Sequence, residues 1–523
     1  MALVLAGVVA PMQKNDEGAA FAGRVWFGDD GAVVDVTARG EASPTGFDGA
    51  PRVGVGNAVI YPGLVDLHSH LGYNTLPLWS DPARTTPYAH HDSWPGEDGY
   101  PQLVSWPAWT LLERVPECVL AYVQVRALAG GTTSIQGWPN VSRQPVNTLV
   151  RCIDDDPIGS LDDPVMVSAL TQTTDQLAGR ARNLSAGRTF VYHCAEGQPG
   201  TIVTREFDDL AATGCLQPGL AAIHCSALDP SHFARWKKAS GLARGPVGAV
   251  VWSPFSNLWL YGTTTDIAAV RSNRVAVCLG TDWGPSGTKN LLGEIKVARL
   301  WSDHQGWSLT DHDLVRMVTA APGDALARAW GQPVGRLVPG GLGDAVVIAR
   351  RAADPWTNLM SARESDVLLV VVGGRARYGT YDLMGAAGAH PTSSIPLGRH
   401  VRRVTLVLPG TKDQVWAWSD LTARLDAVRA DAARRPPSGP AGVRRQRLPD
   451  RLPLAGDPPG TPPIAARPDM PAAPAQVAGP PPKGVTVNIP PIEGLYHSLS
   501  WLRTIKGRGF HGGALDGLAG FYR

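Results

Sequence analysis

Lysine, excess charge and paired cysteines are all scarce in this 523-residue chain. No lysine lies between Lys14 and Lys237, and the formal net charge is only +2. This balance excludes bulk electrostatic binding of nucleic acid, so we expect no nucleic-acid partner. The six cysteines are scattered without a Cys-x-x-Cys pair, which indicates reduced, buried thiols and excludes a disulfide framework or a zinc finger.

Long apolar runs are missing as well. No stretch approaches the roughly 20 apolar residues that a membrane-spanning helix requires, so we expect no membrane partner. Residues 1–10 are apolar but lack a basic segment, and Pro11 follows at once, so a first strand is a better interpretation than a signal peptide. These features predict a cytoplasmic protein.

From Tyr61 onward, short apolar runs alternate with amphipathic stretches. The runs that predict strands lie at residues 132–136, 165–170, 189–193, 220–224, 247–252 and 275–281. Such alternation is typical of an α/β fold with a parallel sheet and helices outside it. About eight strands over about 270 residues favour a closed (β/α)8, TIM-like barrel over an open sheet.

The other segments are arranged around this barrel. We predict the N-terminal part of a composite β domain at 1–61, the barrel at 62–332, the C-terminal part of the β domain at 333–400, a strand plus amphipathic helix at 401–433, a Pro-rich linker at 434–486, and a tail at 487–523. The linker holds 15 prolines between Pro436 and Pro482 and is too poor in apolar residues to form a core. The tail recovers aromatic residues, and docking and disorder both stay open for it.

Metal-ligand residue types stand at the ends of four predicted strands. If residues 64–70 form a strand, His68 and His70 point to the same face. His193, His224 and Asp282 end three later runs. Each one alone fits a core histidine or a helix N-cap equally well. Because the carboxyl ends of barrel strands converge, the joint pattern predicts a metal site.

Several motifs resemble one family in both content and order. They are the segment from Pro62 to His70, Gly131-Thr132-Thr133, His193-Cys194-Ala195-Glu196, the segment from Ser253 to Leu258, Gly280-Thr281-Asp282, and the segment from Gly335 to Asp344. Over residues 1–380, the chain resembles the amidohydrolase superfamily, in its branch of chlorohydrolases and aminohydrolases that includes cytosine, guanine and S-adenosylhomocysteine deaminases and triazine hydrolases.

This resemblance implies a metal-dependent hydrolase that acts on carbon–nitrogen bonds other than peptide bonds. His68, His70, His193 and Asp282 would bind one divalent metal ion, Zn²⁺ or Fe²⁺. Glu196, His224 and Asp282 would act on substrate and water. Binuclear relatives bridge two ions with a lysine on the fourth strand, and the corresponding segment here, residues 164–171, offers neither lysine nor carboxylate. One ion is therefore expected.

The loop after His70, at residues 71–110, is long enough to form a pocket rim. The predicted pocket residues are Tyr73, Asn74, Trp79, Trp109, Trp138, Asn257 and Trp283. Aromatic walls suit a small planar or aromatic substrate, although these tryptophans could instead pack the loop onto the barrel. His90 and His91 are interpreted as solvated loop residues, with a second metal site as the alternative.

We expect hydrolytic deamination of a heterocycle. The alternatives are hydrolysis of an amide, a lactam or another leaving group in a specialised pathway, and a non-catalytic scaffold of the same fold. The sequence leaves the substrate, the native metal and a homo-oligomeric state open.

Overall fold

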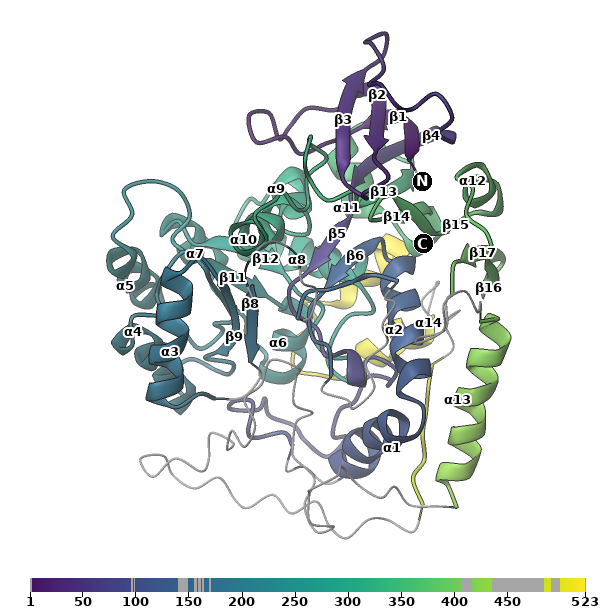
Figure 1. The fold of residues 1–523 in the computed structure, drawn as a ribbon. Coiled ribbons are helices and arrows are strands. Elements are labelled where there is room, and N and C mark those ends of the chain that lie inside the picture. The colour runs from purple at the N-terminus through teal and green to yellow at the C-terminus, as the bar shows by residue number, and fades with distance from the viewer. Residues whose placement is uncertain are drawn as a thin grey trace.

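The structure is a computed structural model. It describes residues 2–95, 97, 99–139, 149–154, 158, 161, 164–168, 171–406, 416–434, 484–490 and 499–522. Within these residues the fold is mixed α/β with parallel-strand sheets (Figure 1). The predicted Pro-rich linker lies almost entirely outside the described residues.

A nine-stranded sheet combines strands from before and after the central segment; it runs from the top of Figure 1 down its right side. Its strands, in spatial order, are β16 (Ser393–Leu397), β17 (His400–Val404), β15 (Arg375–Gly379), β14 (Val367–Val372), β13 (Ala345–Ala349), β4 (Arg52–Pro62), β1 (Leu3–Val9), β2 (Phe21–Phe27) and β3 (Val33–Ala38). Strand β4 pairs parallel with β1 and antiparallel with β13, so strands from before and after the central segment share one apolar core.

Within the described residues, the central segment holds eight parallel strands in two groups. The first group is β5 (Leu64–Asp66), β6 (Thr132–Ile135) and β7 (Arg151–Cys152), and the second is β8 (Val165–Ser168), β9 (Thr189–Cys194), β10 (Leu220–His224), β11 (Ala249–Trp252) and β12 (Ala276–Leu279). A strand is present at each of the six runs predicted from residue 132 onward. The two-residue strand β7 was not predicted, because so short a run carries no periodicity.

Helices follow most of these strands, as the alternation predicted. They are α1 (Trp106–Arg114), α2 (Pro116–Ala129), α3 (Thr174–Ser185), α4 (Arg205–Ala212), α5 (Pro230–Ser240), α6 (Pro254–Tyr261), α7 (Ile267–Ser272), α8 (Leu291–Gln305), α9 (Asp311–Arg316) and α10 (Ala320–Trp330). The first turns after His70 and before α1 are η1 (Leu71–Tyr73) and η2 (Pro101–Ser105), and η3 (Ile202–Thr204) precedes α4. Beyond the barrel segment lie α11 (Pro355–Ser361), η4 (Glu364–Asp366) and α12 (Tyr381–Ala386).

The two parallel groups meet at the seam between β5 and β12. The Asp282 amide donates to the His68 carbonyl at 2.9 Å, and Ser69 and Asp282 form a parallel bridge. Between β7 and β8, no ladder occurs within the described residues. The closed barrel therefore remains a prediction. The strand predicted at 64–70 ends earlier, at Asp66, and the chain turns at His68 to His70.

The C-terminal elements pack back onto the central segment. Helix α13 (Trp418–Ala432) lies along α2, where Trp418 stacks on Tyr122 with ring centroids 5.8 Å apart. Helix α14 (Leu499–Ile505) and η7 (Asp516–Tyr522) lie near α6 and α8. There Trp501 stacks on Phe255 at 5.4 Å, so the described part of the tail is docked.

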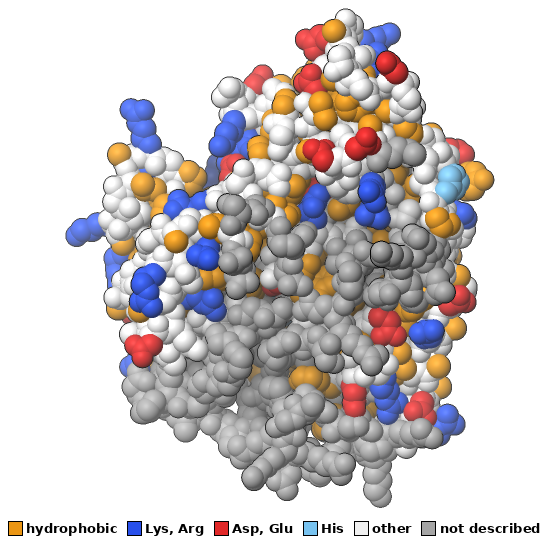
Figure 2. Space-filling view, in the orientation of Figure 1, with side chains coloured by type: hydrophobic (Ala, Val, Ile, Leu, Met, Phe, Trp, Pro, Cys, Tyr) orange, Lys and Arg blue, Asp and Glu red, His pale blue; other side chains and the backbone are white. Residues whose placement is uncertain are grey.

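The surface of the protein carries side chains of both charges (Figure 2). In the described part of the chain, no helix has the length and apolar character needed to cross a membrane. Positive and negative side chains both occur on the face drawn in Figure 2. This distribution agrees with the small net charge of +2.

Candidate metal centre and active site

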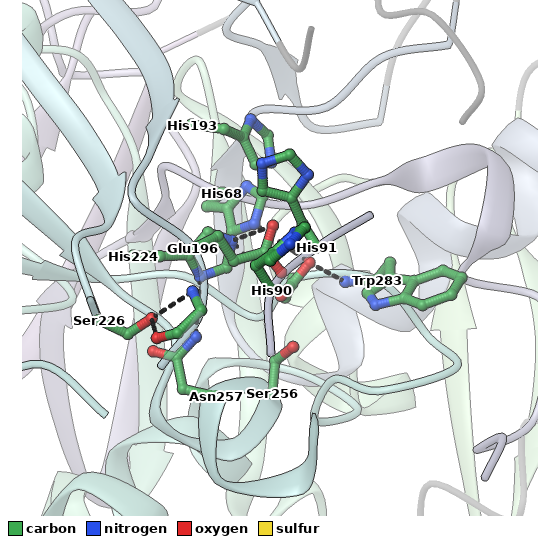
Figure 3. A network of polar contacts seen from close by, with 12 residues as sticks. His68, His90, His91, His193, Glu196, His224, Ser226, Ser256, Asn257 and Trp283 are labelled. Atoms are coloured by element: carbon green, nitrogen blue, oxygen red, sulfur yellow. Dashed lines mark hydrogen bonds and ion pairs between the residues drawn. The ribbon is translucent and has the colours of Figure 1, made fainter. Parts of the chain in front are cut away.

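Four strand ends bring histidine and carboxylate side chains to one place. The ring centroid of His68, which follows β5, lies 5.0 Å from that of His70, 4.7 Å from that of His193 and 5.0 Å from that of His224. Asp282 Oδ1 lies 3.1 Å from His68 Nε2 and 3.7 Å from His70 Nε2. Figure 3 shows His68, His193, His224 and Glu196 pointing toward one another.

The backbone is unusual where these side chains turn inward. Ala195, His224, Cys225 and Asp282 have φ between 53° and 64°, in the left-handed region that residues with a side chain rarely adopt. Each such residue costs roughly 1–3 kcal/mol and persists only where the surrounding structure enforces it. Here the tight turns after β9, β10 and β12 bring polar side chains from separate strands into one cluster.

The cluster fits a divalent metal ion. Ligand atoms of His68, His193 and His224 lie within 4.8 Å of one another, as do those of His68, His70 and Asp282, and both sets share His68. Both ring nitrogens of His68 and Asp282 Oδ2 are buried and have no hydrogen-bond partner among the described residues; His68 Nε2 lies 3.1 Å from Asp282 Oδ1 but without hydrogen-bond geometry. Buried polar atoms left this way are costly, and imidazole nitrogen with carboxylate oxygen is a donor set that suits Zn²⁺ and Fe²⁺.

The charge state of Asp282 agrees with a cation site. Burial alone would raise the pKa of Asp282, but the adjacent His68, His224 and His70 together hold it well below its usual range. Because its pKa is lowered, Asp282 is an ionised carboxylate. Its side chain is only 3% exposed, so the site around it is nearly dry. A carboxylate of this kind is a good ligand and can also accept a proton.

Hydrogen bonds from outside the cluster hold the ring of His193 and the backbone of His68, two of the candidate ligands. His193 Nδ1 lies 3.2 Å from the Ser168 carbonyl, which accepts its proton and leaves Nε2 for a metal. Asp66 accepts from the His68 amide and from the amide and hydroxyl of Thr281, so it joins the ends of β5 and β12. Burial raises the pKa of Asp66 to about 6, against the lowering effect of the Thr281 and His68 hydrogen bonds.

A chain of hydrogen bonds determines where His224 carries its proton. The Trp252 indole can only donate, and it donates to Thr264 Oγ1 at 2.7 Å. Thr264 Oγ1 in turn donates to Asn257 Oδ1 at 3.1 Å, and the Asn257 amide nitrogen lies 3.0 Å from His224 Nδ1. His224 Nδ1 accepts, so the proton of the neutral ring is on Nε2.

This tautomer separates His224 from the other histidines. A protonated Nε2 donates hydrogen bonds and does not coordinate a metal. It lies 3.7 Å from Glu196 Oε2 and 3.9 Å from Asp282 Oδ2, between the two carboxylates. The geometry thus favours His68, His70, His193 and Asp282 as ligands, with His224 as a donor beside them.

A small cavity opens over the cluster. Its lining consists of His70, Tyr73, Trp94, Tyr100, His193, Glu196, His224, Asp282 and Trp283. Two of the predicted pocket residues, Tyr73 and Trp283, are therefore at the cavity, where their rings meet edge to face at 5.3 Å. Aromatic walls around a polar floor suit a small planar molecule.

The other five predicted pocket residues do not line this cavity. Asn74 donates to Ser69 Oγ and accepts from the Gly284 amide, so it connects two loops. Asn257 lies behind His224, as described above. Trp79 stacks on Tyr88. Trp109 and Trp138 pack in the apolar core, Trp109 on α1 and Trp138 after β6.

His91, in the loop after His70, does not face solvent. His91 is buried, and its two ring nitrogens lie 3.0 Å from Asp92 Oδ1 and 3.2 Å from Glu206 Oε1. The interpretation of His91 as solvated is therefore wrong. Because Glu206 is on α4, this contact ties the loop after His70 to the central segment.

Three residues of the site escaped the sequence analysis: Asp66, Tyr100 and Tyr261. Trp94 lies in the loop predicted to form the pocket rim but was not among the predicted pocket residues. A signal existed for Asp66, an acidic residue inside an otherwise apolar strand. Trp94 and Tyr100 are two among many aromatic residues of one long loop, and no local pattern separates them from Trp79 or Trp109. Tyr261 ends α6, which no predicted element covered.

Comparisons with known proteins give matches among solved structures alone. No protein-family model matches the chain, and no curated protein matches it. A guanine deaminase from C. acetobutylicum with bound guanine is 14% identical, with a TM-score of 0.51 over 72% of this chain and 100% of that chain. An adenosine deaminase from Xanthomonas campestris with bound zinc is 17% identical, with a TM-score of 0.56 over 82% and 98%.

A mutant of atrazine chlorohydrolase from Arthrobacter aurescens, complexed with zinc and atraton, is 15% identical, with a TM-score of 0.54 over 82% of this chain and 99% of that chain. At such identities the likeness shows a shared fold. The resemblance predicted from the motifs, to the deaminase and chlorohydrolase branch of the amidohydrolase superfamily, is thereby confirmed for the fold.

Proposed function

We propose that this chain, which has the fold of these deaminases and hydrolases, is an amidohydrolase that cleaves a C–N bond of a small molecule, and that its reaction is hydrolytic deamination of a heterocycle. The observation that carries the proposal is the meeting of four histidines and two carboxylates at the ends of strands far apart in sequence; three of these histidines and both carboxylates line one cavity. The solved deaminases of the same fold support it.

His68, His70, His193 and Asp282 would hold one divalent ion, at the rim of a closed eight-stranded barrel. Zn²⁺ is favoured because structures of the same fold contain it, with Fe²⁺ as the alternative. When bound, such an ion is a Lewis acid that lowers the pKa of water to about 7.

The protein side chains would then move the protons. Asp282 accepts a proton from the attacking water, because its oxygen Oδ2 is ionised and has no competing hydrogen bond in the described structure. His224 donates its Nε2 proton as a hydrogen bond to the oxygen that adds to the trigonal carbon. Asp282 would return this first proton to the ring nitrogen of the opened C=N bond. Glu196, starting as a carboxylate, would take the hydroxyl proton of the adduct as the carbonyl forms and pass it to the leaving nitrogen, which departs as ammonia or an amine.

A second candidate reaction would use the same groups to hydrolyse an amide or a lactam, or to displace another leaving group such as a halide. The chlorohydrolase among the structures of this fold favours keeping this candidate. A non-catalytic scaffold is the remaining alternative.

The test combines metal analysis of the purified full-length protein with ammonia release from a panel of aminoheterocycles. We expect about one zinc or iron per chain and ammonia from at least one compound. The control is Glu196→Gln, which retains the ligands and should release none. A metal-loaded wild type that releases no ammonia from any compound would refute deamination.

A further inference from the structure

Tyr261, the last residue of α6, holds the carboxylate of Glu196. Its hydroxyl lies 2.6 Å from Glu196 Oε1 and 3.0 Å from the indole Nε1 of Trp94. An indole N–H only donates, so Trp94 occupies a lone pair of the Tyr261 oxygen. An ionised carboxylate only accepts, so the Tyr261 hydroxyl donates its hydrogen to Glu196.

This arrangement makes the two oxygens of Glu196 different. Oε1 accepts a charge-assisted hydrogen bond from Tyr261, whereas Oε2 faces His224 Nε2 at 3.7 Å. Tyr261 is 1% exposed and Trp94 is 4% exposed, so bulk water does not compete for these bonds. Tyr261 is not among the residues that line the cavity.

We propose that Tyr261 is a positioning residue for Glu196: it holds Oε1, so that Oε2 is the oxygen that exchanges a proton with the leaving group. This inference rests on the proposed function. Trp94 acts one step further out, because its indole orients the Tyr261 hydroxyl.

Trp94 also joins this arrangement to the metal centre. It belongs to the loop between His70 and α1, and its ring stacks on Trp283 with centroids 4.9 Å apart and an angle of 27° between the planes. The Trp283 amide donates to Asp282 Oδ1 at 2.8 Å. Trp94, in the loop between His70 and α1, thus contacts Tyr261, which donates to Glu196, and Trp283, whose amide donates to Asp282.

The chain offers a matched control for the loss of a hydroxyl. Tyr88 is also buried at the contact between this loop and α6, where its amide donates to the Leu260 carbonyl at 3.0 Å. Its hydroxyl has no hydrogen-bond partner within the described residues. Tyr88→Phe therefore removes a buried hydroxyl from the same region without touching Glu196.

The experiment compares zinc-loaded wild type, Tyr261→Phe and Tyr88→Phe, all full length. Ammonia release is measured with the best compound of the aminoheterocycle panel, together with zinc content and melting temperature. For Tyr261→Phe we expect an unchanged KM and zinc content and a kcat that is lower by about 10- to 100-fold, because a hydrogen bond to a charged group is lost. Tyr88→Phe should keep the wild-type kcat.

A crystal structure of zinc-loaded Tyr261→Phe gives a second, independent result. We expect the Glu196 carboxylate to rotate or to occupy two positions. A kcat equal to that of Tyr88→Phe, or a Glu196 that stays in its wild-type position, would overturn the inference. If wild type releases no ammonia at all, the proposed function fails, and the position of Glu196 in the crystal alone decides about Tyr261.

Discussion

Replacing Gly280 by alanine should displace His68 and weaken metal binding. A Cβ built on Gly280 would lie 2.5 Å from His68 Cβ and 3.1 Å from both the His68 carbonyl oxygen and Val251 Cγ1. Ordinary contact begins at 3.4 Å, so the backbone around His68 must move by about 0.9 Å (3.4 minus 2.5). Metal-ligand distances tolerate only about 0.2 Å, and disturbed ligand support typically costs 10- to 100-fold in affinity.

The assay is a competition titration of zinc against a chromophoric chelator, with melting curves recorded in parallel. We expect the zinc affinity of Gly280→Ala to fall by about 10- to 100-fold. Gly54→Ala is the matched control, because an added Cβ on this exposed residue of β4 meets nothing within 4 Å. Its zinc affinity should equal that of wild type.

Wild-type zinc affinity in Gly280→Ala would refute the reasoning. It would mean that the seam between β5 and β12 relaxes without moving His68, or that His68 is not a ligand. A crystal structure of the variant would distinguish these two explanations through the position of the His68 ring.

Other variants test the site and its support. Glu196→Gln should keep its zinc and lose turnover by about 10²- to 10⁴-fold, whereas His68→Ala should lose the zinc itself, as metal analysis would show. Burial lowers the pKa of Lys296 to about 8, below its value of about 10.4 in an unfolded chain, so stability should rise from pH 8 to pH 10. Lys296→Met should remove that part of the rise in urea unfolding, and an unchanged slope would contradict it. Trp501→Ala removes the stack on Phe255 and should lower the melting temperature, while an unchanged value would show that the tail does not support α6.

The polar residues that cluster at the strand ends could be predicted because the signals are local. Runs such as 220–224 alternate with amphipathic stretches, and this periodicity depends only on neighbouring residues. The polar residue that ends each run, for example His193 or Asp282, is visible without knowledge of any contact. That these polar residues lie close together then follows from the parallel arrangement of the strands, whose carboxyl ends meet at one side.

The long loop after His70 could not be predicted in this way. Its aromatic residues are alike in sequence, and contacts with residues more than a hundred positions away decide which of them face the cavity. Trp79 is held away by its amide, which donates to the Pro285 carbonyl at 2.7 Å, while Trp94 reaches Tyr261 and Trp283. No local pattern contains that information.

The sequence by itself therefore determined which residue types are available for metal binding and at which strand ends they stand. Only the tertiary structure decided their hydrogen-bonding partners: that Asn257 orients His224, and that Tyr261 holds Glu196. The reason is physical, because periodicity is a property of neighbouring residues, whereas the direction of a hydrogen bond depends on groups that only the folded chain brings together.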